Sequence, residues 1–135
     1  MPGLTGVSHV ELTVSDVDRS ARWYREVLGF DTVLVETDAP DFFEGRVISL
    51  LRPDLGLAIG LVQHQDGDRG RFSEFRVGLD HLAFAADSRS DLEAWTEHFD
   101  RHGVPYSAIN DMPYASVVVF RDPDGIQLEL FALPA

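Results

Sequence analysis

Apolar side chains recur at every second position over residues 8–14, SHVELTV, which places His9 and Glu11 on the opposite, polar face. This alternation predicts a half-buried strand. Over residues 17–28 the apolar positions recur with a helical period, and Gly29 supplies a helix stop. Strand-like apolar runs follow over residues 30–37, 46–52 and 55–64. The first half of the chain is therefore predicted as β-α-β-β-β.

The second half of the chain repeats this order of elements. His81 opens an apolar run as His9 does, and a tryptophan follows each histidine at the same distance, at Trp23 and Trp95. A helix is predicted over residues 90–102, where Gly103 ends it. Strands are predicted over residues 79–86, 104–109, 115–120 and 126–131. The pattern indicates two copies of one architectural module.

The length of the chain suits one domain that contains both modules. With 135 residues, 44% of them hydrophobic, the chain can bury a sizeable core. We place module one at about residues 7–64 and module two at about residues 79–133. The polar, glycine-containing stretch of about residues 65–78 is the predicted linker.

Charge and composition exclude several classes of partner. A formal net charge of -12 with only 11 lysines and arginines repels nucleic-acid phosphates and anionic lipid heads, so neither nucleic acid nor a membrane is an expected partner. No leader segment or membrane-spanning run is recognised, so a cytoplasmic location is expected. The chain has no cysteine, and any metal ion must therefore be held by His, Asp or Glu.

Two sequence segments carry a family resemblance, HVELTVSDVDRSARWYREVLGF at residues 9–30 and FRDPDGIQLELF at residues 120–131. With the paired β-α-β-β-β modules, they resemble the vicinal oxygen chelate superfamily, which includes glyoxalases, bleomycin-resistance proteins, fosfomycin-resistance transferases and extradiol dioxygenases. The resemblance implies an α+β fold in which two βαβββ modules form an eight-stranded open cup. Helices would cover the outer face, and the concave face would bind a small-molecule substrate.

The resemblance also implies a divalent metal ion, held by His9, His81 and Glu129. Strand phase places Glu129 on one face of its strand with Gln127, and a buried carboxylate needs a partner. Two imidazoles and one carboxylate suit iron, manganese, nickel or zinc with open positions for substrate. A single histidine on an apolar strand is more often a hydrogen-bonded core residue than a ligand. Three ligand-type residues at three matching positions favour the metal site here.

One position departs from the glyoxalase pattern. Where glyoxalase I enzymes carry a further glutamate in the last strand of the first module, this chain has Gly60. Glu11, two residues from His9 on the same strand face, is the candidate general base. His64 shares the phase of Gly60 and is expected at the rim of the cup. The alternative interpretations are that Glu11 is merely exposed and that His64 only ends a strand.

Further cup residues are predicted from strand phase alone. They are Ser116, Val118, Phe120 and Gln127.

The predicted function is that of a metal-dependent, glyoxalase-like lyase or isomerase, in which the ion chelates vicinal oxygens of a small substrate. The alternative is a metal-free binding protein of bleomycin-resistance type that sequesters its ligand, and an extradiol-type dioxygenase ranks third. Fosfomycin transfer is disfavoured because only LFALPA follows Glu129. A homodimer is expected, since two-module chains of the superfamily commonly pair and each module leaves an open sheet edge.

Overall fold

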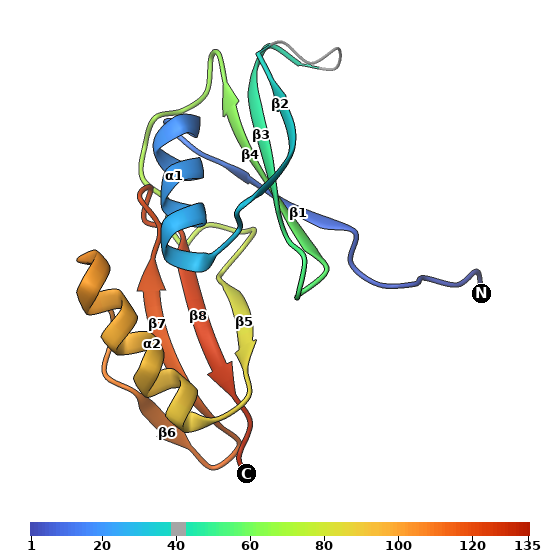
Figure 1. The fold of residues 1–135 in the computed structure, drawn as a ribbon. Helices are drawn as coiled ribbons and strands as arrows, with labels where there is room; N and C mark the ends of the chain where they lie inside the picture. Colours follow the sequence, from blue (N-terminus) through green and yellow to red (C-terminus); the bar gives the residue numbers. More distant parts are fainter. Residues whose placement is uncertain (39–42) are drawn as a thin grey trace. The chain divides into compact units, whose positions relative to one another are not determined.

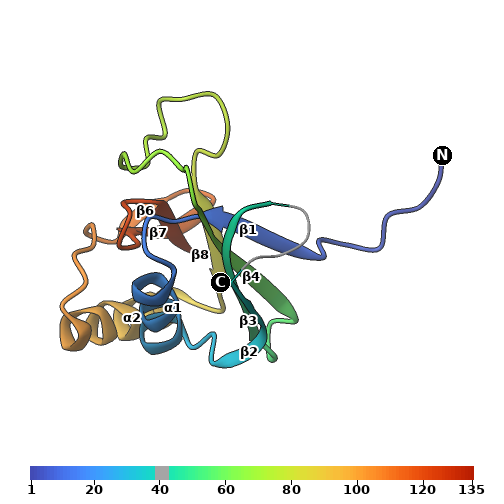
Figure 2. The same ribbon diagram turned by 90° about the horizontal axis from the view of Figure 1, so that it is seen from above.

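The computed structural model describes residues 1–38 and 43–135. The chain divides into two compact units, Met1–Gly70 and Arg71–Ala135, and each is described by itself. Residues 1–8 are exposed and run away from the sheet of the first unit (Figures 1 and 2). In the described part of the chain, no helix is long and apolar enough to cross a membrane.

Unit one is a four-stranded sheet with one helix. Its elements are β1 (His9–Thr13), α1 (Val17–Leu28), β2 (Thr32–Thr37), β3 (Gly45–Arg52) and β4 (Leu57–His64). The strand order is β1-β4-β3-β2, with β1 parallel to β4 and the other pairs antiparallel (Figure 1). The first and last strands of the unit therefore lie side by side.

Unit two repeats this topology. Its elements are β5 (Leu82–Ala86), α2 (Arg89–His102), β6 (Asn110–Met112), β7 (Ala115–Arg121) and β8 (Gln127–Ala132). The order is β5-β8-β7-β6, and β5 runs parallel to β8. Two open mixed sheets, each with its own helix, confirm the predicted α+β class and the βαβββ module.

The helices begin and end where the sequence predicts, within one residue. The Asp16 side chain accepts a hydrogen bond from the Arg19 amide (3.0 Å) at the start of α1, and Gly29 ends α1 with φ 73°. Ser88 caps α2 in the same way, and Gly103 ends it with φ 65°. A left-handed residue after a helix is most favourable for glycine, which has no Cβ.

Each sheet buries the face that meets its helix. In unit one the fully buried side chains Leu50, Ile59 and Leu61 come from the sheet, and Tyr24 comes from α1. In unit two the corresponding core consists of Leu92, Phe99, Val118, Phe120, Leu128 and Leu130. The opposite face of each sheet is left to carry the polar residues of interest.

One predicted strand, over residues 104–109, is not formed. Pro105 has no amide hydrogen to donate to a ladder, and only a bridge between Tyr106 and Phe120 occurs in this segment. Ser107 then bonds Val119 through both its backbone and its hydroxyl group. The second strand of the second module is instead the short β6, at residues 110–112.

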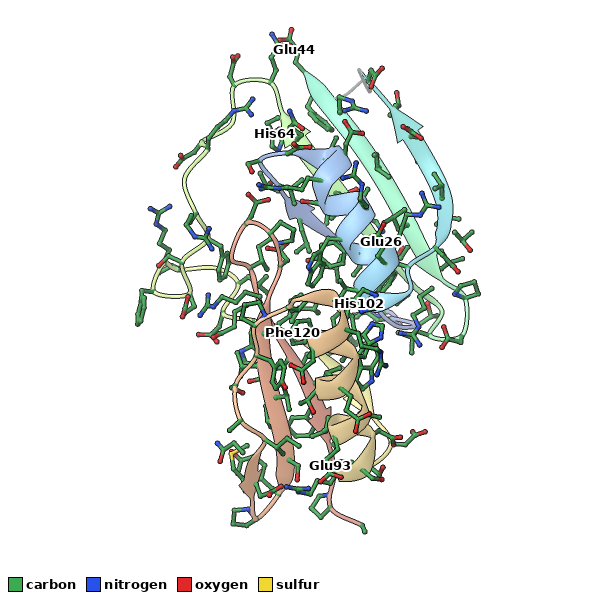
Figure 3. The ribbon with its side chains drawn as sticks, turned by 60° about the vertical axis from the view of Figure 1, so that its left-hand side comes forward. Glu26, Glu44, His64, Glu93, His102 and Phe120 are labelled. Carbon is green, nitrogen blue, oxygen red and sulfur yellow. The ribbon has the colours of Figure 1, made fainter. Side chains whose placement is uncertain are left out.

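The predicted orientation of β7 is wrong by one residue. Val118 pairs with Leu130 and Phe120 with Leu128, so Ser116, Val118 and Phe120 lie on the helix-facing side of the sheet. The Phe120 ring lies 4.6 Å from Phe99 of α2, centroid to centroid (Figure 3). A shift of one residue in a strand moves every side chain to the other face.

The corrected orientation of β7 can be tested by stability. We expect Phe120→Ala to lower the free energy of unfolding by about 3–5 kcal/mol, because it empties a fully buried site. Val119→Ala, on the opposite and half-buried side of the strand, should cost only about 1 kcal/mol. Urea unfolding followed by circular dichroism measures both changes. Equal costs for the two variants would contradict the observed register.

Candidate functional site

His81 and Glu129 come together in unit two. His81 immediately precedes β5, and the parallel register pairs Ala83 of β5 with Glu129 of β8. His81 Nε2 lies 3.4 Å from Glu129 Oε2, and the Glu129 side chain is only 18% exposed. Burial of a carboxylate is costly without a facing cation or donor, and the group that faces Glu129 is the His81 imidazole.

The other ring nitrogen of His81 faces a second carboxylate. Asp80 Oδ1 lies 2.7 Å from His81 Nδ1. The Gln127 amide group donates to Asp80 twice, to Oδ1 and to the backbone carbonyl oxygen, each at 3.2 Å. Gln127, predicted as a cup residue, lies on the same face of β8 as Glu129. It binds Asp80, which in turn contacts His81.

Arg121 extends this set of contacts. Its Nη2 donates to Gln127 Oε1 at 3.3 Å and to Glu74 at 2.8 Å, and its Nη1 donates to the Gly125 carbonyl oxygen. The Arg121 guanidinium keeps the pKa of the Glu74 carboxyl below its usual value. Sequence reasoning missed Asp80, Arg121 and Glu74. Of these three residues, only Asp80 could have been found from the sequence, because it directly precedes the predicted ligand His81.

Unit one carries a comparable pair, His9 and Glu11. His9 Nε2 lies 4.0 Å from Glu11 Oε1, and both side chains are about half exposed. The Ser8 hydroxyl lies 3.0 Å from His9 Nδ1. Strand alternation places both residues on the sheet face opposite α1, because the intervening Val10 is directed toward the helix side with its partner Ile59.

Gly60 explains where the Glu11 carboxylate goes. The parallel register places Gly60 of β4 directly opposite Glu11 of β1. A Cβ atom at Gly60 would lie 2.8 Å from Glu11 Cγ and 3.1 Å from Oε1. The Glu11 side chain thus occupies the space above position 60, and a carboxylate stands over β4 although β4 itself supplies none.

The two units take their carboxylate from different strands. Aligning the modules equates Glu11 with Ala83 and Gly60 with Glu129. In unit one the acid comes from the first strand and the residue opposite is glycine. In unit two the acid comes from the last strand and the residue opposite is alanine. Each strand pair has room for one long acidic side chain beside its histidine.

The other predicted site residues lie elsewhere. His64 is the exposed last residue of β4, with its ring 5.0 Å from that of Phe43, at the end of the sheet (Figure 3). Val118 and Phe120 belong to the core, and the Ser116 hydroxyl donates to Asp111 at the far end of β7. Strand pairing instead places Val117, Val119 and Arg121 on the face of Glu129.

The chemistry of the His81 and Glu129 pair fits part of a metal site. A neutral imidazole nitrogen and a carboxylate oxygen are ligands for zinc, iron and manganese. A histidine ligand usually donates its other N–H to a carboxylate, and Asp80 Oδ1 lies within hydrogen-bond distance of His81 Nδ1. Within residues 1–38 and 43–135, no three His, Asp or Glu side chains gather closely enough to hold an ion. The predicted third ligand, His9, belongs to unit one.

These features agree with the family that the chain matches. The model of the Glyoxalase/Bleomycin resistance protein/Dioxygenase superfamily matches residues 6–130. The chain therefore belongs to this superfamily, as its repeated motifs indicate.

Similar proteins have been described by several names. A glyoxylase/bleomycin resistance protein/dioxygenase domain from Frankia sp. EAN1pec is 37% identical, with a TM-score of 0.85 over 98% of this chain and 94% of that one. YaeR of Escherichia coli is 31% identical over 97% of this chain and 98% of its own length. The metallothiol transferase FosB of Staphylococcus haemolyticus is 29% identical over 94% of this chain and 83% of its own.

The contact between Glu11 and Gly60 predicts an energetic coupling. Gly60→Ala improves strand formation but crowds Glu11, so its effect on unfolding free energy should be less favourable with Glu11 present than in a Glu11→Ala background. We expect the difference to be about 0.5–3 kcal/mol, as is typical of contacting residues. Denaturant unfolding of the four proteins measures it. The same cycle with Thr13→Ala, the next residue on that face, is the control, and additivity in both cycles would refute the contact.

Proposed function

We propose that this protein is a metal-dependent enzyme of glyoxalase type, a lyase or isomerase that acts on a small substrate with two neighbouring oxygen atoms. In this proposal His9, His81 and Glu129 hold one divalent ion. The observation that carries it is the facing pair of Glu129 and His81, because Glu129 is mostly buried and faces a side chain of a type that binds metals. The similarity to a metallothiol transferase also supports the use of a metal.

The bound ion would supply Lewis-acid polarisation of a substrate oxygen. The chain itself must then orient the substrate and move a proton. Glu11 suits the second role, because its carboxylate lies above Gly60, half exposed and 4.0 Å from a ring nitrogen of His9. A general base must reach the proton that it removes, and this position borders one of the proposed ligands.

The metal site predicts a stoichiometry. Titration calorimetry with manganese, iron(II), nickel or zinc should show one ion per chain for at least one of these metals. His81→Ala should abolish this uptake because it removes a ligand. Glu11→Gln should leave the affinity nearly unchanged, and with a substrate it should lower turnover by about a hundredfold to ten-thousandfold. Failure of all four metals to bind would favour a metal-free binding protein of bleomycin-resistance type.

One further histidine pair calls for a control. His98 and His102 lie one turn apart on α2 with ring centroids 4.2 Å apart, and such a pair can take up zinc or nickel by itself. The titrations are therefore made in a His98→Ala, His102→Ala background. The proposed site predicts that this background retains one ion per chain, and loss of all uptake in it would overturn the proposal.

We also propose that the protein is a homodimer. Strand β2 is an edge of its sheet and exposes three consecutive apolar residues, Val33, Leu34 and Val35. Phe75 and Val77, before β5, are 93% and 109% exposed. Apolar side chains on a free sheet edge are normally covered, and a second copy in twofold pairing is the commonest cover.

A dimer would allow the three ligands to come from one chain or from two. Light scattering at micromolar concentration should give the mass of two chains, and a monomer mass would reject the dimer. Mixing His9→Ala with Glu129→Ala chains then separates the two arrangements by zinc uptake. If the sites are shared, each heterodimer regains one intact site. If each site is built within one chain, every mixture remains unable to bind.

A further inference from the structure

The contacts of His81 distinguish its two ring nitrogens. Asp80 Oδ1 lies 2.7 Å from Nδ1, within ordinary hydrogen-bond distance. Glu129 Oε2 lies 3.4 Å from Nε2, which is longer than a normal N–H to oxygen bond. A neutral imidazole carries one proton, and the shorter contact to a carboxylate retains it. The lone pair is then left on Nε2, on the side of Glu129.

An exposed aspartate can do this only if it is itself held. The Asp80 side chain is 67% exposed, so it would sample several rotamers in the absence of a partner. The Gln127 amide group binds both its carboxylate and its backbone carbonyl oxygen. These two contacts hold the carboxylate at His81 and tie Asp80, two residues before β5, to the first residue of β8.

The direction of the Gln127 amide is set in turn by Arg121. A guanidinium group only donates hydrogen bonds, so the Gln127 atom that faces Arg121 must be the oxygen. The amide nitrogen must then face Asp80. Arg121 is kept in place by two bonds to Glu74 and one to the Gly125 carbonyl oxygen. Donor and acceptor are therefore assigned in turn from Arg121 to Gln127 and from Gln127 to Asp80.

Unit one provides an internal comparison. At the positions equivalent to Asp80, Gln127 and Arg121 it has Ser8, Ala58 and Leu51. His9 is therefore contacted at Nδ1 by a hydroxyl group, which can donate or accept and does not select one ring form. The polar series belongs to the second module alone, although both modules have the same topology.

We propose that Asp80 is a positioning residue that keeps the proton of His81 on Nδ1 and its lone pair on Nε2 beside Glu129. Gln127, oriented by the Arg121–Glu74 ion pair, holds Asp80 in this role. That the free Nε2 then serves as a metal ligand rests on the function proposed above. The ring form of His81 in the metal-free protein is independent of that function.

The ring form is read directly by long-range ¹H–¹⁵N correlation spectra of the metal-free protein above pH 8. All variants carry His98→Ala and His102→Ala, and His81→Ala assigns the signal. Wild-type His81 should show the Nδ1–H form, and Asp80→Ala should shift it toward the Nε2–H form. Gln127→Ala should cause a smaller shift. Asp87→Ala, which removes the same charge just after β5, should have no effect.

Zinc titration of the same proteins tests the consequence. Asp80→Ala should weaken zinc binding by about 10–100-fold without changing the stoichiometry, as loss of a partner to a ligand does, whereas Asp87→Ala should not. An unchanged ring form in Asp80→Ala overturns the proposal. A changed ring form with unchanged affinity overturns its link to the metal. If the parent protein binds none of manganese, iron(II), nickel and zinc, the metal function fails while the spectra still decide the role of Asp80.

Discussion

The parallel pairing of the first and last strands in each unit is the constraint on which the candidate site depends. It brings residues far apart in sequence to neighbouring positions, as Ala83 and Glu129 show. A parallel pair cannot be closed by a tight turn, and in each unit a helix and two further strands lie between its members. The helix then covers one face of the sheet, and the other face carries the histidines and acids of the candidate site. The contact of His81 with Glu129 follows from that arrangement.

Space between the paired strands limits what each unit can hold. With Glu11 in its observed conformation, a methyl group at position 60 would lie too close to the glutamate side chain. Opposite Glu129 the residue is Ala83, which also leaves room. The two units therefore reach a similar chemical result, an acid beside a histidine, with the acid on different strands. Glyoxalase I enzymes carry a glutamate at the position of Gly60. In this chain a carboxylate reaches the same place from the neighbouring strand β1, at Glu11.

The two histidines are nevertheless not equivalent. His81 lies between two carboxylates and belongs to a series of polar contacts that ends at the Arg121–Glu74 ion pair. His9 has a hydroxyl group on one side and a more distant, more exposed carboxylate on the other. Duplication of a fold thus leaves each copy free to change its polar face, because the core that defines the fold lies on the opposite face of each sheet.

The sequence by itself determined the order of elements and the family, and through the family resemblance it placed His81 and Glu129 in one predicted site. Apolar periodicity and glycine stops are local signals, and they located α1 at residues 17–28. The orientation of β7 was not determined, because it depends on the number of residues in the turn between β7 and β8. Only the tertiary structure decided that Glu11 fills the space of Gly60 and that Gln127 holds Asp80, since both contacts join segments that no local pattern relates.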